Sequence, residues 1–239
     1  MSKIRIYIEP AGIKNQIQIK EKAVIHKAKD VLRLNKTKRV YVFDGQGAEY
    51  LYRIREMDKR SILIDQESVE RKETPPSKKI IVGFPLIKED KVDFILQKAT
   101  ELGAYAFWPF TCERSMQGEF SCLKLERWRR IVIEATRQSN RVWLPQIMRT
   151  SSIKTLIARE FDIKVAASVD GQNLKGVIKK QWKELLFIVG PEGDFSPSEY
   201  QQLREGDFGF VKFAPHILRT ETAAIFGVGL INYSMDVHR

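Results

Sequence analysis

Two stretches near the C-terminal end of the sequence combine charged residues with glycine and small residues in a way that suits ligand binding. In the first, the apolar run 185–189 leads into the Gly-Pro-Glu-Gly segment 190–193. In the second, the run 208–213 precedes Arg219 and Glu221, which stand among small and apolar residues. Each pattern predicts a buried strand that ends in a loop. Ligands in open α/β sheets bind outside the carboxyl ends of strands, so we interpret the pair as one site rather than two ordinary turns.

The first of these loops is followed by a strong helix start. Ser196 suits the N-cap, Pro197 the first helical position, and Glu199 the third position of a capping box. Phe195 is placed to pack on Tyr200 as a hydrophobic staple. We therefore expect the loop to be held at both ends.

The composition favours a polyanionic partner. The chain has 239 residues, with 41 Lys and Arg against 30 Asp and Glu, which gives a net charge of +11. Nucleic acid is the first expectation for such a basic protein.

The sequence predicts neither a metal site nor a disulfide framework. Its only cysteines are Cys112 and Cys122, and His26, His216 and His238 are scattered. It contains no apolar run of membrane-spanning length, and its first residues read as a strand rather than a signal peptide. We expect a cytosolic protein without a structural metal.

The first 70 residues read mostly as strands with one buried face. Ile4, Ile6 and Ile8 alternate with polar or aromatic residues. The pattern predicts a small β-barrel with one short helical piece at 24–34. The Gly-Gln-Gly of 45–47 lacks the third glycine and the long helix of a dinucleotide fingerprint, so we interpret it as a hairpin turn. The predicted strands are 4–8, 16–20, 39–43, 50–54 and 62–64.

A polar, proline-containing segment at 70–77 is the best candidate for a domain boundary. Beyond it, strands and helices alternate, which predicts a largely parallel sheet covered by helices on both faces. Physical rules alone predict an unknotted sheet. The predicted strands are 80–84, 104–110, 163–168, 185–189 and 208–213, and the predicted helices are 89–102, 123–139 and 222–235.

Five separated blocks of this sequence resemble the ribosomal RNA small subunit methyltransferase E family. The two C-terminal blocks are 190–193 and 217–223, and the central blocks lie at 97–103, 109–115 and 134–141. The family belongs to the SPOUT, or α/β-knot, superfamily. Its members use S-adenosylmethionine to methylate N3 of one uridine in 16S ribosomal RNA of the small ribosomal subunit.

The resemblance implies an α/β protein of two domains. Residues 1–72 are expected to form a PUA-like, RNA-binding β-barrel, and residues 73–239 a SPOUT methyltransferase domain with a mostly parallel sheet and a deep trefoil knot. The last helix is apolar on nearly every side, so one stripe can pack on the sheet while the rest needs another cover. A homodimer supplies that cover, as the shared active sites of the family also imply.

The chemistry of this reaction suggests roles for individual residues, and the resemblance implies the cofactor-binding set. Arg219 is expected to stabilise negative charge on the uracil, and Glu192 or Glu221 to orient groups or accept the proton. For Glu221 the alternative is simple charge complementarity with a helix N-terminus. The expected cofactor-binding residues are Pro109, Gly190, Pro191, Glu192, Gly193, Ile217, Leu218, Arg219, Thr220, Thr222 and Ala223.

Basic residues in three regions are candidates for RNA contact. Arg130, Arg137 and Arg141 are spaced by seven and four, so on a continuous helix they share one face. Solvated surface charge is the alternative interpretation for each candidate, and phosphate contacts would make binding salt-dependent. The full set is Arg5, Lys27, Arg33, Arg114, Arg130, Arg137, Asn140 and Arg141.

The chain departs from the family pattern near both loops. Asp194 stands where the family usually has a second glycine, and Ala214 and His216 fall in a segment that is usually Leu-Gly-x-Arg. Asp tolerates positive φ better than most residues, while His216 lacks the permanent charge and fork of arginine. The competing functions are a catalytically silent RNA-binding ribosome-assembly protein of the same fold and, more remotely, another SPOUT enzyme.

Overall fold

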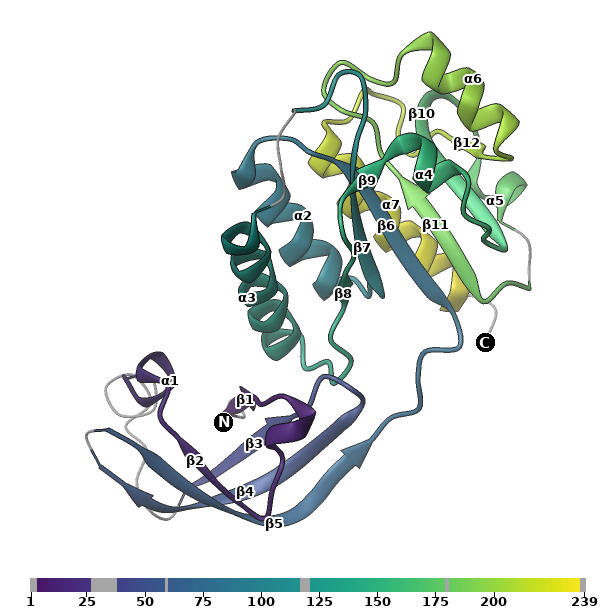
Figure 1. Ribbon diagram of the computed structural model, residues 1–239. Helices are drawn as coiled ribbons and strands as arrows, with labels where there is room; N and C mark the ends of the chain where they lie inside the picture. The colour runs from purple at the N-terminus through teal and green to yellow at the C-terminus, as the bar shows by residue number, and fades with distance from the viewer. Residues whose placement is uncertain (1–3, 27–37, 59, 117–120, 179–180, 237–239) are drawn as a thin grey trace. The chain divides into compact units, whose positions relative to one another are not determined.

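The protein, seen in a computed structural model, divides into two compact units. The structure describes residues 4–26, 38–58, 60–116, 121–178 and 181–236 (Figure 1). The N-terminal unit comprises Met1–Pro75 together with Arg137–Leu144, and the C-terminal unit comprises Pro76–Thr136 and Pro145–Arg239. Residues 137–144 therefore belong with the N-terminal unit although they are distant from it in sequence.

The N-terminal unit is built on a five-stranded mixed sheet with strand order β1-β3-β4-β5-β2. β1 runs parallel to β3, and the other pairs are antiparallel. Alternate residues such as Val40, Val42 and Ile64 are buried in its core, as the period of two predicted. The elements are β1 (Arg5–Tyr7), a short 3-10 helix (Pro10–Gly12), β2 (Gln16–Ile19), α1 (Lys22–His26), β3 (Arg39–Phe43), β4 (Ala48–Met57) and β5 (Ile62–Lys72).

The glycines at 45 and 47 form the tight turn between β3 and β4. Gly45 has φ 73° and Gly47 has φ 102°, values that favour glycine. The Asp44 carboxylate accepts hydrogen bonds from the amides of Gln46 and Ala48, at 2.7 and 3.0 Å. The hairpin interpretation of this segment is confirmed.

The C-terminal unit contains a seven-stranded sheet in which every pair is parallel, as predicted. The strand order is β12-β10-β11-β6-β7-β8, and β9 pairs with β7. The strands are β6 (Lys79–Pro85), β7 (Ala106–Thr111), β8 (Gln146–Ile147), β9 (Ser151–Ser152), β10 (Ile163–Gln172), β11 (Glu184–Ile188) and β12 (Gly209–Val211).

Helices cover both faces of this sheet (Figure 1). Successive strand residues point to opposite faces, and apolar residues are buried on both. On one face the Phe84 ring lies 5.9 Å from that of Trp128 in α3, and Gly227 of α7 lies against Phe187. On the other face Ile81 shares a core with residues of α4 and α6. The helices are α2 (Glu89–Glu101), α3 (Cys122–Gln138), α4 (Ile153–Ile157), α5 (Leu174–Val177), α6 (Pro197–Glu205) and α7 (Thr220–Asp236).

Two boundaries differ from the sequence prediction. β5 continues to Lys72, where it pairs with the start of β4, so the predicted linker 70–77 begins inside a strand. α3 ends at Gln138, and Asn140 adopts φ 60°, a left-handed conformation that stops a helix. Arg141 therefore does not share a helix face with Arg130 and Arg137, and that expectation is wrong. Lys27 and Arg33 lie outside the described residues.

Candidate active site

A cavity of about 780 Å³ lies beyond the carboxyl ends of β10, β11 and β12. Its walls come from the ends of these strands and from the two loops that the sequence singled out, 190–194 and 212–219. This is the position at which an open α/β sheet exposes backbone groups to a ligand. The lining residues are Lys91, Ala167, Ser168, Val169, Val189, Gly190, Pro191, Glu192, Gly193, Asp194, Val211, Lys212, Phe213, Ala214, His216, Ile217, Leu218, Arg219, Thr220 and Ala223.

The loop after β11 forms a tight turn. The Asp194 amide donates a 2.9 Å hydrogen bond to the Pro191 carbonyl, and Asp194 itself adopts φ 61°. A Cβ on Gly190 would lie 2.9 Å from the Asp194 carboxylate, so a larger residue there would displace that carboxylate. The Tyr200 hydroxyl donates to the same carboxylate at 2.8 Å. The loop therefore presents its backbone to the cavity.

The helix that follows fixes the other end of this loop as predicted. Ser196 caps α6, and its amide donates to the Glu199 carboxylate at 2.9 Å, which completes the capping box. The rings of Phe195 and Tyr200 lie 5.8 Å apart in an edge contact.

The loop after β12 is joined to the first loop by a partly buried hydrogen bond. The Thr220 hydroxyl donates to the Gly190 carbonyl at 2.9 Å, and Thr220 is the first residue of α7. Ala223, one turn further along α7, is buried and lines the cavity. The start of α7 therefore contributes two small side chains to the wall of the cavity.

Four charged residues gather at the edge of the cavity. The Lys91 ammonium donates a hydrogen bond to the Glu192 carboxylate and lies 4.0 Å from an oxygen of Glu221. The hydrogen bond that Lys91 donates to Glu192 raises the pKa of Lys91, and the same bond lowers the pKa of Glu192. Arg219 is exposed at the rim and lowers the pKa of Glu192 further. The carboxylates of Glu192 and Glu221 both face Lys91. Perturbed pKa values such as those of Lys91 and Glu192 cluster at functional sites.

Most of the predicted cofactor-binding residues line this cavity. The exceptions are Pro109, which lies on β7 beside Phe84, and Thr222, which is exposed on α7. The sequence prediction missed Lys91 and residues 167–169 of β10. Neither carried a motif, because Lys91 looks like any solvated lysine in the first turn of an amphipathic helix.

Comparison with known proteins identifies the family. The RNA methyltransferase domain family matches residues 73–232. The ribosomal RNA small subunit methyltransferase E of Bacillus subtilis (strain 168) is 32% identical over 231 residues, which cover 90% of this chain and 89% of the relative. The protein of the same name from Aquifex aeolicus (strain VF5) is 38% identical over 190 residues, or 78% and 82% of the two chains. The chain belongs to the ribosomal RNA small subunit methyltransferase E family.

A solved structure supports the cofactor of this methyltransferase family. The crystal structure of the methyltransferase E from Neisseria gonorrhoeae, bound to S-adenosylmethionine, superposes with a TM-score of 0.88 at 26% identity and covers 98% of each chain. The cavity of this chain fits such a cofactor, because its volume lies in the usual range for small-molecule sites. Glycines and alanines permit close approach of the backbone to the ligand, and two carboxylates, of Glu192 and Asp194, suit a sulfonium charge. This family member is an S-adenosylmethionine-dependent methyltransferase.

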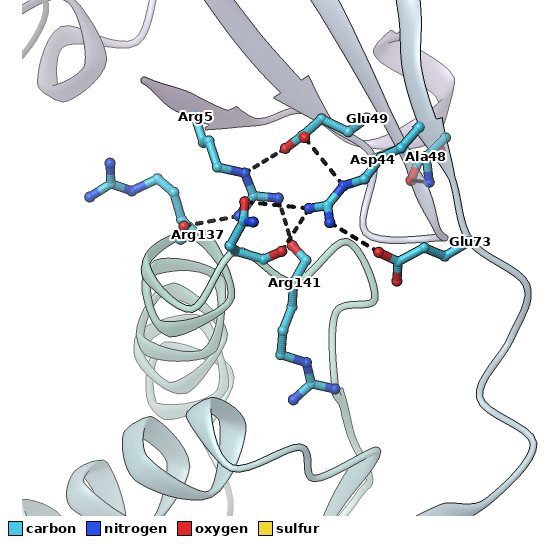
Figure 2. A network of polar contacts seen from close by, with 9 residues as sticks. Arg5, Asp44, Ala48, Glu49, Glu73, Arg137 and Arg141 are labelled. Atoms are coloured by element: carbon cyan, nitrogen blue, oxygen red, sulfur yellow. Dashed lines mark hydrogen bonds and ion pairs between the residues drawn. The ribbon is translucent and has the colours of Figure 1, made fainter. Parts of the chain in front are cut away.

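The candidate RNA-binding residues occupy different environments. Arg5 is buried and donates to Glu49 at 2.5 Å and to the carbonyls of Arg137 and Arg141, at 2.9 and 2.7 Å (Figure 2). Arg71 adds a 3.3 Å ion pair to Glu49 and a 2.6 Å hydrogen bond to the Asn140 carbonyl. Three backbone carbonyls of 137–141 are thus held by two arginines that share one buried carboxylate.

The remaining candidates are more accessible to a ligand. Arg114 and Arg130 are exposed, and Arg114 also donates to the Gly193 carbonyl at 2.5 Å. Arg137 and Arg141 are half-buried, and burial lowers the pKa of Arg141 to about 10. Arg141 therefore remains charged at neutral pH.

Proposed function

We propose that this chain methylates N3 of one uridine in 16S ribosomal RNA of the small ribosomal subunit, with S-adenosylmethionine as methyl donor. The observation that carries the proposal is the cavity at the ends of β10, β11 and β12, lined by both C-terminal blocks of the methyltransferase E family. The basic composition of the chain suits an RNA substrate. The reaction belongs in the cytoplasm, with the ribosome.

The residues at the rim of the cavity have separate roles in this proposal. When bound, the cofactor supplies an electrophilic methyl group on a positively charged sulfur. The uracil N3 must lose its proton before it can attack, and Arg219 stabilises the negative charge that develops on the ring. Glu192 lines the cavity and Glu221 does not, so Glu192 is the better placed acceptor for the proton, and it becomes a stronger base when Lys91 no longer donates to it. Glu221 does not line the cavity, and it holds Lys91 and the start of α7 by charge.

The backbone of the two loops forms the proposed cofactor cradle. Gly190 and Gly193 let the chain approach the adenosine closely, while Leu218, Ala223 and neighbouring apolar groups cover its faces. Holding both reactants in one orientation supplies much of the rate of such a transfer. Pro109 and Thr222 remain predictions for this cradle on family resemblance.

The two parts of the chain have distinct proposed roles. Residues 1–72 form a PUA-like, RNA-binding barrel, and residues 73–239 form the SPOUT methyltransferase domain with its trefoil knot. The mixed sheet of the N-terminal unit and the parallel sheet of the C-terminal unit support this division. The proposed RNA contacts are Arg114, Arg130, Arg137, Asn140 and Arg141, with Lys27 and Arg33 from the barrel. We assign Arg5 a positioning role instead, because its guanidinium is engaged by Glu49.

A homodimer is part of the proposal. α2 and α7 pack against each other, and together they expose the large apolar side chains of Phe94, Leu102, Phe226 and Tyr233, the last two with 45% and 69% of their surface accessible. Such a cluster on neighbouring helices suits a second copy of the chain. A sedimentation mass of one chain would count against this arrangement. Within the described part of the chain, none of the helices is long and apolar enough to cross a membrane.

Primer extension tests the activity. The protein is incubated with S-adenosylmethionine and small subunits that lack the modification, and reverse transcriptase is then run across the 16S RNA. A methyl group on N3 blocks the pairing edge of uridine, so we expect one new strong stop opposite a single uridine. Arg219→Ala should abolish the stop, whereas Arg204→Ala, an exposed arginine of α6 outside the cavity, should retain it. Cofactor binding without a stop would favour the silent RNA-binding protein.

A further inference from the structure

Lys91 lies between two carboxylates that come from different elements. It is in the first turn of α2 and, among the described residues that line the cavity, it alone comes from that helix. Its ammonium donates to Glu192, which sits on the 190–194 loop and is 58% exposed. The same ammonium lies 4.0 Å from Glu221 at the start of α7, whose side chain is only 12% exposed. One cation therefore faces one exposed and one nearly buried acid.

Glu221 is left incompletely satisfied by this arrangement. Its Oε2 atom, the one nearest Lys91, is buried and has no hydrogen-bond partner among the described residues. A buried carboxylate oxygen without a donor costs free energy, and this cost is removed if Lys91 turns to it. Glu192 loses little by the exchange, because its exposed oxygens can bond to water instead. Moving Lys91 would therefore exchange a hydrogen bond to an exposed carboxylate for one to a buried carboxylate.

We propose that Lys91 is a positioning residue that moves between these two carboxylates and thereby latches the 190–194 loop. When Lys91 donates to Glu192, it ties the loop to α2 at the edge of the cavity. When it donates to Glu221, the tie between the loop and α2 is broken, and the loop can open for exchange of the ligand about its remaining contacts with Thr220 and Arg114. The identity of that ligand, the methyl donor and its product, rests on the proposed function.

Two substitutions of opposite effect follow from this arrangement. Lys91→Met removes the latch, so the loop should open more often. Glu221→Gln removes the competing charge, so Lys91 should remain on Glu192 and the loop should open less often. If Lys91 and Glu221 only supported the fold, both substitutions would loosen the loop.

Amide hydrogen exchange of the ligand-free protein measures the latch directly. In the peptide that contains 190–194, we expect exchange to be about fivefold faster in Lys91→Met, the factor expected for one lost hydrogen bond. Glu192→Gln should give a similar increase, and Lys91→Met should add little to it in the double variant. Exchange should be about twofold or more slower in Glu221→Gln. Lys91→Arg keeps a charged donor and should restore slow exchange.

Dissociation of S-adenosylhomocysteine gives the second readout. This product lacks the sulfonium charge, so the loss of a lysine changes its binding through the loop rather than through direct repulsion. Its dissociation rate should rise in Lys91→Met and fall in Glu221→Gln. Failure of the wild-type chain to bind this probe would count against the proposed function, while the hydrogen exchange would still decide the latch.

Lys79→Met is the matched control. Lys79 donates to Glu184 at 2.8 Å and is 31% exposed, against 20% for Lys91. It is the first residue of β6, whereas Lys91 follows the last residue of that strand. Its removal should leave exchange of the 190–194 peptide unchanged. The proposal is overturned if Lys91→Met matches Lys79→Met, or if Lys91→Met and Glu221→Gln shift the loop in the same direction.

Discussion

The hydroxyl of the buried Thr220 donates a 2.9 Å hydrogen bond to the carbonyl of Gly190, and this partly buried contact joins the two loops that line the cavity. Thr220→Val keeps the shape of the side chain and leaves that carbonyl without its partner. We expect the free energy of unfolding to fall by about 1–3 kcal/mol. S-adenosylmethionine should bind about fivefold or more weakly, because both loops contribute to its cradle.

Urea unfolding and calorimetric titration measure these two effects. Thr220→Ser, which keeps the hydroxyl, should bind the cofactor much as the wild type does. Equal affinities of the valine and serine variants would show that this hydrogen bond does not position the cradle.

Asp194 occupies a backbone conformation that favours glycine, with φ 61°. Asp194→Gly should preserve the loop and lose the two hydrogen bonds that the carboxylate accepts, from the Tyr200 hydroxyl and the Phe195 amide, both at 2.8 Å. Asp194→Val should be less stable than the glycine variant by about 2 kcal/mol, because a branched side chain is strongly disfavoured at positive φ. Urea unfolding of the two variants tests this difference. Tyr200→Phe isolates the hydrogen bond from the Tyr200 hydroxyl, and a valine variant as stable as the glycine variant would contradict the strain argument.

The sequence predicted those parts of the molecule whose causes are local. The capping box at Ser196, the turn at 45–47 and the apolar alternation of the strands are set by neighbouring residues, and the structure confirms them. The two loops were found because glycine and charge directly follow a buried strand. Their side-by-side position followed from the parallel order of the sheet.

What the sequence could not reveal depends on contacts between distant segments. Lys91 reaches the site through the packing of α2, and Arg5 is buried because Glu49 and the backbone of 137–141 surround it. Both look like ordinary solvated basic residues in the sequence. The end of α3 also depends on the left-handed conformation of Asn140, which the sequence pattern did not predict.

Cys112 is buried, and burial raises the pKa of its thiol to about 11. The folded protein therefore keeps the proton over a pH range in which an unfolded cysteine, with a pKa of about 8.5, loses it. Because the folded state binds more protons, its stability should fall as pH rises from about 8.5 to about 11. The free energy of unfolding should fall more steeply with pH in the wild type than in Cys112→Ala, by up to ~1.4 kcal/mol per pH unit.

Alkylation provides a second check on the same cysteine. Iodoacetamide at pH 8 should modify the exposed Cys122 and spare Cys112 until urea unfolds the chain. Peptide mapping distinguishes the two sites. Rapid labelling of Cys112 in the folded protein would contradict its burial.

The last prediction concerns the buried ion pair of Arg5 and Glu49, whose side chains are 4% and 0% exposed. Glu49→Gln leaves two arginines without their shared carboxylate, and removing one partner of a buried pair costs about 3–5 kcal/mol. Glu67 offers a matched control in the same sheet, because it also pairs with two arginines, Arg39 and Arg53, at 2.7 and 2.5 Å. Those arginines are largely exposed, so Glu67→Gln should cost less than about 1 kcal/mol.

The same pair of variants tests what the buried network positions. Arg5 and Arg71 hold the carbonyls of Arg137, Asn140 and Arg141, so Glu49→Gln should also increase hydrogen exchange in 139–144. If those residues contact RNA as proposed, the KM for the small subunit should rise while affinity for S-adenosylmethionine stays unchanged. Equal unfolding free energies for Glu49→Gln and Glu67→Gln would show that burial adds nothing to this pair, and the positioning role would fall with it.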